Sequence, residues 1–107
     1  MTGCCQVTTT LPDQATAELV AATVVAERLA ACAQVLGPLS STYLWKGGTE
    51  QAQEWYCHLK TTLLRLPDLQ KRICELHPYE LPEIIALPIL DGDNAYLEWI
   101  RNQVKAE

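Results

Sequence analysis

The sequence predicts an α+β fold with the order strand, helix, strand, strand, helix, strand and a further C-terminal helix. Two observations predict this order: β-branched or alternating stretches flank segments of helical periodicity, and Gly47-Gly48 separates two of these stretches as a hairpin turn would. The order is the split pattern of the ferredoxin-like βαββαβ sandwich, in which helices cover one face of a sheet. The other face stays bare, and a chain of 107 residues buries it most easily by self-association. We therefore expect an oligomer, of an order that the pattern does not specify.

The first strand is expected at Cys4–Thr10, which is short and rich in β-branched residues. Leu11-Pro12-Asp13 ends it, and Asp13 is a favourable N-cap for the next element. A helix is expected from Gln14 to Ala31, because this stretch is rich in Ala, Leu and Glu and lacks Gly and Pro. Its core-facing stripe is expected to contain Leu19, Ala22, Ala26 and Leu29.

A long hairpin is expected in the middle of the chain. Gly37-Pro38 breaks the pattern after the helix, and Ser40–Lys46 is expected as a strand. The return strand alternates most clearly, with Trp55, Cys57, Leu59 and Thr61 on one face and Glu54, Tyr56, His58 and Lys60 on the other. Both strands are long for so small a domain, and such hairpins often extend beyond their own sheet to meet another subunit.

Three further elements complete the prediction. A second amphipathic helix is marked by Leu66, Leu69, Ile73 and Leu76, with Pro67 in its first turn. A last core strand is expected at Glu83–Ile89, followed by a turn and a short helix at Ala95–Val104 with Tyr96, Ile100 and Val104 on one side. No repeat or linker interrupts the chain, so residues 1–107 are expected to form a single domain.

Composition and missing motifs restrict the function. The formal charge of −5 predicts an acidic surface that repels phosphate backbones, so nucleic-acid binding is disfavoured. Five cysteines without a CxxC pair indicate reduced thiols, and no targeting or bilayer-spanning stretch is visible. We therefore expect a cytoplasmic protein without a membrane partner. The phosphate-binding GxxxxGK[ST], dinucleotide-binding GxGxxG and nucleophile GxSxG motifs are also missing.

The stretch from His77 to Glu83, with the sequence HPYELPE, contains the most suggestive chemistry. Its two prolines restrict the backbone and would hold His77, Tyr79 and the carboxylates in a fixed arrangement. An imidazole beside carboxylates suits divalent cations such as copper or zinc. A loop histidine that is hydrogen-bonded to a carboxylate or carbonyl is an equal alternative.

Other candidate residues have a structural and a functional interpretation. Cys32 is either a small core residue or a soft metal ligand, and its expected place at a helix C-terminus disfavours a catalytic thiolate. Cys4 and Cys5 would point to opposite strand faces. Glu54 and Lys60 form either a surface charge pair or, in a cleft with Trp45 and Tyr79, a site that orients a small polar ligand. His58 is expected to be solvated or at an interface.

Five segments, in the same order, resemble the CutA divalent-cation tolerance proteins, and the resemblance as a whole covers the chain from about Val7 to Ile100. They are ERLAAC at 27–32, STYLWKG at 41–47, LKT at 59–61, HPYELPEI at 77–84 and YLEWI at 96–100. The resemblance implies a ferredoxin-like protomer in a tight homotrimer similar to the PII signalling proteins, with ligand sensing in clefts between subunits. It also implies a link to tolerance of copper and other divalent cations, without an established enzymatic reaction.

One departure from this family concerns the metal. Some bacterial members that bind copper carry a Cys just before their Thr-x-Pro-Asp segment and two adjacent His before Pro-Tyr. Here these positions hold Thr9 and Leu76-His77, so only His77 of that set is present. We therefore expect weak binding of copper or another divalent cation, with His77 and Cys32 as the candidate ligands.

The resulting hypothesis is a trimeric, non-enzymatic protein of the divalent-cation (copper) response that binds metal ions or a small ligand at intersubunit clefts. The expected cleft residues are Tyr43, Trp45, Glu54, Lys60, His77, Tyr79 and Glu83. One alternative is a small ferredoxin-like enzyme of the acylphosphatase type, which needs a phosphate cradle with an Arg and an Asn. None of the four arginines lies in such a loop. A purely structural trimer is the other alternative.

Overall fold

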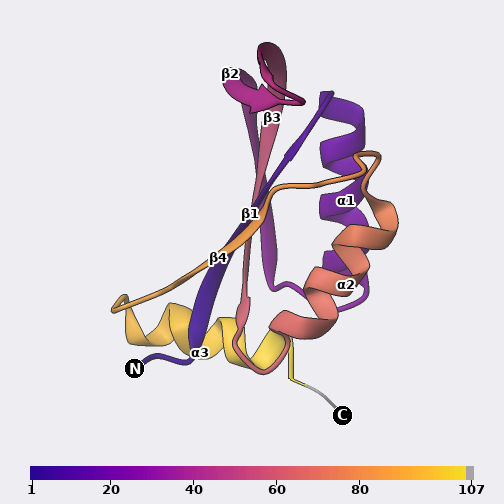
Figure 1. Cartoon of the computed structure of the whole chain (residues 1–107). Coiled ribbons are helices and arrows are strands. Elements are labelled where there is room, and N and C mark those ends of the chain that lie inside the picture. Colours follow the sequence, from indigo (N-terminus) through magenta and orange to yellow (C-terminus); the bar gives the residue numbers. More distant parts are fainter. Residues whose placement is uncertain (106–107) are drawn as a thin grey trace.

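The computed structural model describes residues 1–105 and contains a four-stranded antiparallel sheet with the strand order β2-β3-β1-β4. The elements follow the predicted order (Figure 1). They are β1 Cys4–Leu11, α1 Gln14–Ala26, β2 Cys32–Trp45, β3 Gly48–Thr62, α2 Leu66–Leu76, β4 Ile84–Pro88 and α3 Asn94–Gln103. The predicted α+β ferredoxin-like arrangement with an extra C-terminal helix is therefore confirmed. No helix within residues 1–105 is long and apolar enough to cross a membrane.

The main core lies between the sheet and helices α1 and α2, which cover the same side of the sheet (Figure 1). Cys57 and Leu59 of β3 are fully buried in it, as the predicted alternation requires. On α2, Leu69 and Ile73 are buried and Asp68 provides an acidic group in the first turn. The alternation of β1 places Cys5 in this core and Cys4 in a second, smaller one, so the two thiols point to opposite faces as predicted. All five cysteines are free thiols.

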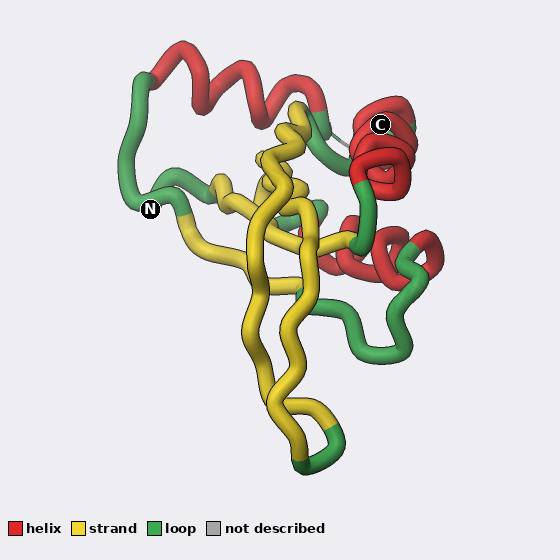
Figure 2. The backbone as a smooth tube through the Cα atoms, turned by 90° about the horizontal axis from the view of Figure 1, so that it is seen from above, coloured by secondary structure: helices red, strands yellow, loops and turns green. Residues whose placement is uncertain are grey.

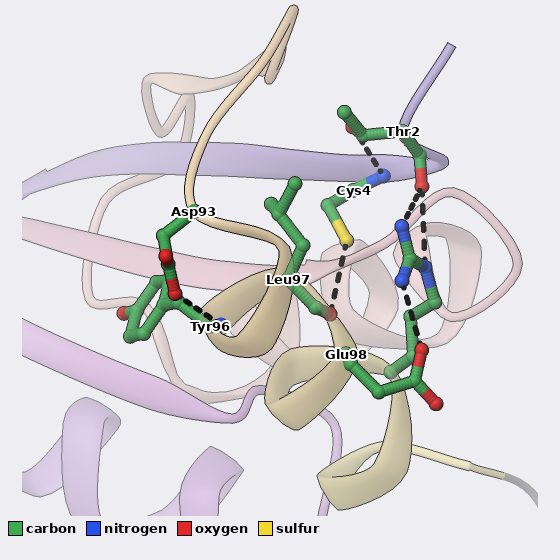
Figure 3. Close-up of polar contacts among 7 residues, drawn as sticks. Thr2, Cys4, Asp93, Tyr96, Leu97 and Glu98 are labelled. Carbon is green, nitrogen blue, oxygen red and sulfur yellow. Dashed lines mark hydrogen bonds and ion pairs between the residues drawn. The ribbon is translucent and has the colours of Figure 1, made fainter.

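The second core attaches α3 to the N-terminal end of β1 (Figure 3). Asp93 caps this helix by accepting a hydrogen bond from the Tyr96 amide at 3.0 Å. Arg101 donates to the Thr2 carbonyl at 2.9 Å, and Leu97 and Ile100 of α3 are buried together with Val104, the residue that follows the helix. Tyr96 precedes Ile100 by one helical turn on the predicted side but is 43% exposed, and Leu97, which the prediction did not include, completes the buried set.

Helix α1 differs from the prediction in its length and in its buried face. It ends at Ala26 rather than Ala31, and Arg28 has a φ of 58°, a left-handed value that breaks the helical path. The amides of Leu29 and Ala30 both donate to the Val24 carbonyl and close the helix end. The buried residues are Ala17, Val20 and Val24, whereas Leu19 of the predicted stripe is 59% exposed.

Strand β2 begins at Cys32 rather than Ser40, so Gly37-Pro38 does not break it. The register against β3 shifts between Leu36 and Leu39, and the Gly37–Pro38 peptide bond is cis. An edge strand tolerates proline, because one of its sides needs no amide donors. Gly37 leaves room for the indole of Trp55, since a Cβ at this position would lie 2.4 Å from its Cδ1 atom.

The β2–β3 hairpin extends beyond the rest of the sheet (Figure 2). The register of β1 against β3 ends at the Leu11–Trp55 pair, so within residues 1–105 the earlier part of β3 pairs with β2 alone. We call residues 39–54 the hairpin extension. Its turn contains Lys46 at a φ of 50° and Gly47 at 81°, the left-handed pair that a tight hairpin needs. The predicted hairpin is confirmed, but its turn lies one residue earlier than Gly47-Gly48, since β3 already begins at Gly48.

Candidate functional site

A cavity of about 720 Å³ lies between the hairpin extension and the loop that connects α2 to β4. We call it the hairpin cleft. Residues 39–45 of β2 and two side chains of β3 form one wall, and the loop at 78–83 forms the other. The lining residues are Thr10, Leu39, Ser40, Ser41, Thr42, Tyr43, Leu44, Trp45, Glu54, Tyr56, Pro78, Tyr79, Glu80, Leu81 and Glu83.

Glu54 and Tyr79 connect the two walls. The Tyr79 hydroxyl donates to Glu54 Oε2 at 2.8 Å. Burial, reinforced by this hydrogen bond and the carboxylate charge, raises the pKa of Tyr79 well above its ordinary value and keeps the hydroxyl protonated as a donor. Glu54 is only 6% exposed, and its Oε1 atom has no hydrogen-bond partner within residues 1–105. A buried carboxylate with spare acceptor capacity therefore lines this cleft.

His77 supports the cleft from behind. Its Nε2 atom lies 2.8 Å from the Thr10 carbonyl, and its Nδ1 atom lies 3.2 Å from the Tyr79 amide. Because a carbonyl only accepts and an amide only donates, the neutral ring carries its hydrogen on Nε2. Burial lowers the pKa of His77, while the Thr10 hydrogen bond and the Glu54 charge oppose this shift. His77 thus fixes Tyr79 against β1, and both of its ring nitrogens are occupied.

The two candidate metal ligands are not brought together in one protomer. Cys32 lies opposite Lys60, which pairs with Gln6 of β1, whereas His77 contacts Thr10. These two points on β1 are about 13 Å apart at roughly 3.3 Å per residue. No group of three or more His, Cys, Asp or Glu side chains in residues 1–105 is arranged to hold a metal ion. The side chains of one protomer therefore do not fit a mononuclear copper site.

Cys32 lies beside a tyrosine hydroxyl and not beside a second candidate metal ligand. Its Sγ atom lies 3.5 Å from the Tyr96 hydroxyl of α3. This contact, followed by burial, raises the pKa of Tyr96 to about 12. Cys32 belongs to the first residues of β2 and not to a helix end, so the dipole argument made from the sequence does not apply to it.

Five of the seven predicted cleft residues line the cleft: Tyr43, Trp45, Glu54, Tyr79 and Glu83. Lys60 does not, because it lies further along β3 and donates to Gln34 Oε1. It is therefore not paired with Glu54, contrary to the prediction of one charge arrangement. His77 lies behind the cleft rather than in its lining.

Sequence reasoning missed several lining residues. Tyr56 shares a strand face with Glu54, so the alternation of β3 could have identified it. Glu80 belongs to the proline-restricted loop and adds a third carboxylate to Glu54 and Glu83. The serine and threonine hydroxyls at 40–42 had no signal in the sequence, because their position depends on how far the hairpin extends.

The second sheet face contains His58. Its Nδ1 atom lies 2.9 Å from Thr8 Oγ1, and its ring stacks on Tyr56 with a centroid distance of 5.2 Å. Burial and the nearby Lys60 charge lower the pKa of His58. This half-buried histidine lies on the face that α1 and α2 leave uncovered, a position that suits the solvated and the interface interpretation equally.

Comparison with known proteins identifies the same family throughout. The family model described as CutA1 divalent ion tolerance protein matches residues 5–103. The divalent-cation tolerance protein CutA of Thermus thermophilus is 44% identical over 92 residues, which is 86% of this chain and 89% of that protein. The protein of the same name in Citrobacter koseri is 43% identical over 96 residues, or 90% and 84% of the two chains. The crystal structure of CutA from Xylella fastidiosa superposes with a TM-score of 0.94 at 38% identity, covering 96% of this chain and 99% of that one.

Proposed function

The chain belongs to the CutA1 divalent ion tolerance family, and we propose that it is a non-enzymatic homotrimer that binds a small ligand in its hairpin clefts. The observation that carries this proposal is the cleft itself, which joins the hairpin extension to the HPYELPE loop. Both segments belong to the resemblance found in the sequence. Buried Glu54 and the aromatic side chains around it form a concave, partly apolar surface with a few polar groups, as small-molecule sites require.

Assembly is supported by apolar surface that the protomer leaves exposed. On the hairpin extension, Leu44 is 80% exposed and Tyr43 is 44% exposed. On the edge strand β4, Ile85 and Leu87 are 48% and 57% exposed. Surfaces of this kind, together with two open sheet edges, favour association with further copies of the chain.

The enzymatic alternative requires a free arginine near a phosphate cradle. Each of the four arginines instead donates to a protein group: Arg28 to Gln103, Arg65 to Asp68, Arg72 to Glu27 and Arg101 to Thr2. None of the four belongs to the cleft lining. These contacts favour a binding protein over chemistry of the acylphosphatase type.

Sedimentation velocity at micromolar concentration tests the assembly. We expect a trimer for the wild type and dissociation for Leu44→Asp, because a charge would enter an apolar interface. Leu64→Asp is the matched control, since Leu64 is 92% exposed in the turn before α2 and lies outside the hairpin extension. A monomeric wild type, or equal effects of the two variants, would contradict the proposed interface.

A thermal-shift screen against nucleotides, carboxylates and amines tests the cleft. A true cleft ligand raises the melting temperature of the wild type and not that of Trp45→Ala, because binding to the folded state stabilises it. If every ligand of the screen leaves the melting temperature unchanged, the structural-trimer alternative is favoured instead.

The metal role of Cys32 and His77 remains a prediction, and cytoplasmic location does too. Since one protomer separates the two side chains, a strong site would need ligands from several subunits. If His77 is a ligand of such a shared site, His77→Gln should weaken the Cu(II) binding that calorimetry measures, and equal binding by the wild type and the variant would contradict the metal role of His77. Tight binding that this variant abolishes would show that His77 gives up its hydrogen bonds to hold the ion.

A further inference from the structure

The charged side chains of the hairpin cleft all have one sign. Glu54, Glu80 and Glu83 contribute three carboxylates to the lining, which contains no Lys, Arg or His. The lysine nearest in sequence, Lys46, has its Nζ atom 5.7 Å from the centroid of the Trp45 ring, at the hairpin turn. A cavity with this lining repels phosphates and carboxylates and attracts cations.

A second observation shows that this is more than an acidic surface. Glu54 is 94% buried, yet only one of its two oxygen atoms accepts a hydrogen bond within residues 1–105. The Oε1 atom is not sealed in the interior, as the unpartnered Thr9 hydroxyl is, so it is open to the cleft and can accept a hydrogen bond from a ligand. An ammonium group supplies both the charge and the hydrogen-bond donors that Oε1 lacks.

The lining also distinguishes an organic cation from a metal ion. The carboxylates do not form a group that could hold a single ion, so they suit charges spread over the length of a ligand. Four aromatic rings belong to the lining, from Tyr43, Trp45, Tyr56 and Tyr79. Such rings bind methylene groups by apolar contact and ammonium groups by cation–π interaction, and Trp45 already holds one ammonium group in this way.

We propose that the hairpin cleft binds a linear aliphatic polyamine. One ammonium group is held at Glu54 Oε1, the methylene chain lies along the aromatic rings, and the remaining ammonium groups face Glu80 and Glu83 at the loop. This inference rests on the proposed function of the cleft as a ligand site, and it names the chemical class of the ligand.

Calorimetric titration of spermidine into the full-length protein at about 0.15 M salt tests the proposal, because free charges are largely screened under these conditions. We expect saturable binding at one site per chain. Glu54→Gln keeps an acceptor for the Tyr79 hydroxyl but removes the charge, so binding should weaken about tenfold or more. Trp45→Ala should weaken it as well.

Glu98→Gln is the matched control, since it removes one negative charge from the exposed surface of α3. It should change spermidine affinity less than twofold, which excludes diffuse attraction to an acidic protein. Equal losses in Glu54→Gln and Glu98→Gln, or no saturable binding of spermidine, would overturn the proposal.

Mg²⁺ and citrate are the remaining probes. If Mg²⁺ competes with spermidine at equal concentration, charge alone decides binding and the polyamine assignment fails. If citrate binds the wild type but not Trp45→Ala while spermidine binds neither, the cleft is a ligand site of the opposite charge class. That result would leave the proposed function intact and refute this inference alone.

Discussion

The two ends of the β2–β3 hairpin differ in how the chain supports them. At the end next to β1, the side chains of Cys57 and Leu59 are fully buried beneath helices α1 and α2. In the hairpin extension, the strands pair with each other, and Leu44 is 80% exposed. The same two strands thus pass from a region with a core of its own to a region without one. In Figure 2 the second region is the part of the hairpin that runs beyond the rest of the sheet.

This difference indicates which apolar side chains of the hairpin are explained by burial within the protomer and which are not. Burial of apolar side chains accounts for the residues at the supported end, at roughly 25 cal/mol per Å² of buried apolar surface. No comparable burial accounts for Tyr43, Leu44 and Trp45 within residues 1–105. An isolated two-stranded hairpin is marginal in water, so the extension gains its stability from contacts beyond the protomer, or from a ligand in its cleft.

The largest effect that can separate the two regions comes from a pair of leucine truncations. Leu69→Ala removes a fully buried side chain from α2 and should lower the free energy of unfolding by about 3 kcal/mol. Leu44→Ala removes an equal volume from the extension and should lower the unfolding free energy of the protomer by less than about 0.5 kcal/mol. Denaturant titration of both variants, at a concentration where the protein is dissociated, measures the difference. Similar losses would mean that the extension has a core of its own.

The junction between the two regions should show the next largest effect. Gly37→Ala places a Cβ atom 2.4 Å from Trp55 Cδ1, a distance that requires the indole to move. Overpacking of this kind should cost about 2 kcal/mol of unfolding free energy, measured by denaturant titration. A second substitution, Trp55→Leu, makes room and should restore part of the loss in the double variant. Full additivity of the two changes would show that the Gly37–Trp55 contact is not the cause.

The sequence predicts the structure best where one face of an element is buried, and less well elsewhere. The alternation of β3 was correct because one face is buried, so a shift by one residue would expose Cys57 and Leu59. The buried face of α1 was wrong, because apolar residues surround this helix and Leu19 on the exposed face resembles Val20 on the buried one. The start of β2 was missed because Gly37-Pro38 would end a central strand, and the sequence does not show that this strand lies at an edge.

The cleft was predicted by residue type and not by distance. Aromatic and carboxylate residues near the hairpin turn and the HPYELPE loop do line it. Lys60 was grouped with Glu54 because both lie on one strand face, but six residues of extended strand separate them by about 20 Å at roughly 3.3 Å per residue. His77 was placed in the cleft because of its neighbours in sequence, whereas the hydrogen bond to Thr10 turns its ring towards β1.

A pH titration should produce a smaller effect at the boundary between the regions. Because the pKa of His77 is lowered in the folded state, the unfolded chain binds this proton more readily, and the free energy of unfolding should fall as pH decreases below about 6.5. Protonation also removes the Nδ1 acceptor of the Tyr79 amide, so spermidine binding should weaken over the same range.

Denaturant titrations of wild type and His77→Gln between pH 7 and about pH 5 check this prediction. The variant should lose part of the pH dependence, and the part that persists belongs to His58, whose pKa is also lowered. If His77→Gln keeps the whole dependence, the coupling between His77 and the Tyr79 loop is not significant.

The smallest expected effect concerns Thr9, in the part of the sheet that helices α1 and α2 cover. Its substitution tests whether packing alone explains the side chains of that region. The Thr9 side chain is fully buried, yet its Oγ1 atom has no hydrogen-bond partner within residues 1–105. Thr9→Val removes this unsatisfied hydroxyl at nearly constant shape and should raise the free energy of unfolding by about 1 kcal/mol. Thr61→Val is the matched control: the equally buried Thr61 hydroxyl donates to the Leu29 carbonyl at 2.7 Å, so its loss should be destabilising by about 1 kcal/mol. If Thr9→Val raises the free energy of unfolding and Thr61→Val lowers it, the Thr9 hydroxyl does not contribute to stability. The helix-covered region then contains a buried polar group that packing and hydrogen bonding do not account for. If both variants lower the free energy of unfolding, the Thr9 hydroxyl stabilises the folded protein as the Thr61 hydroxyl does.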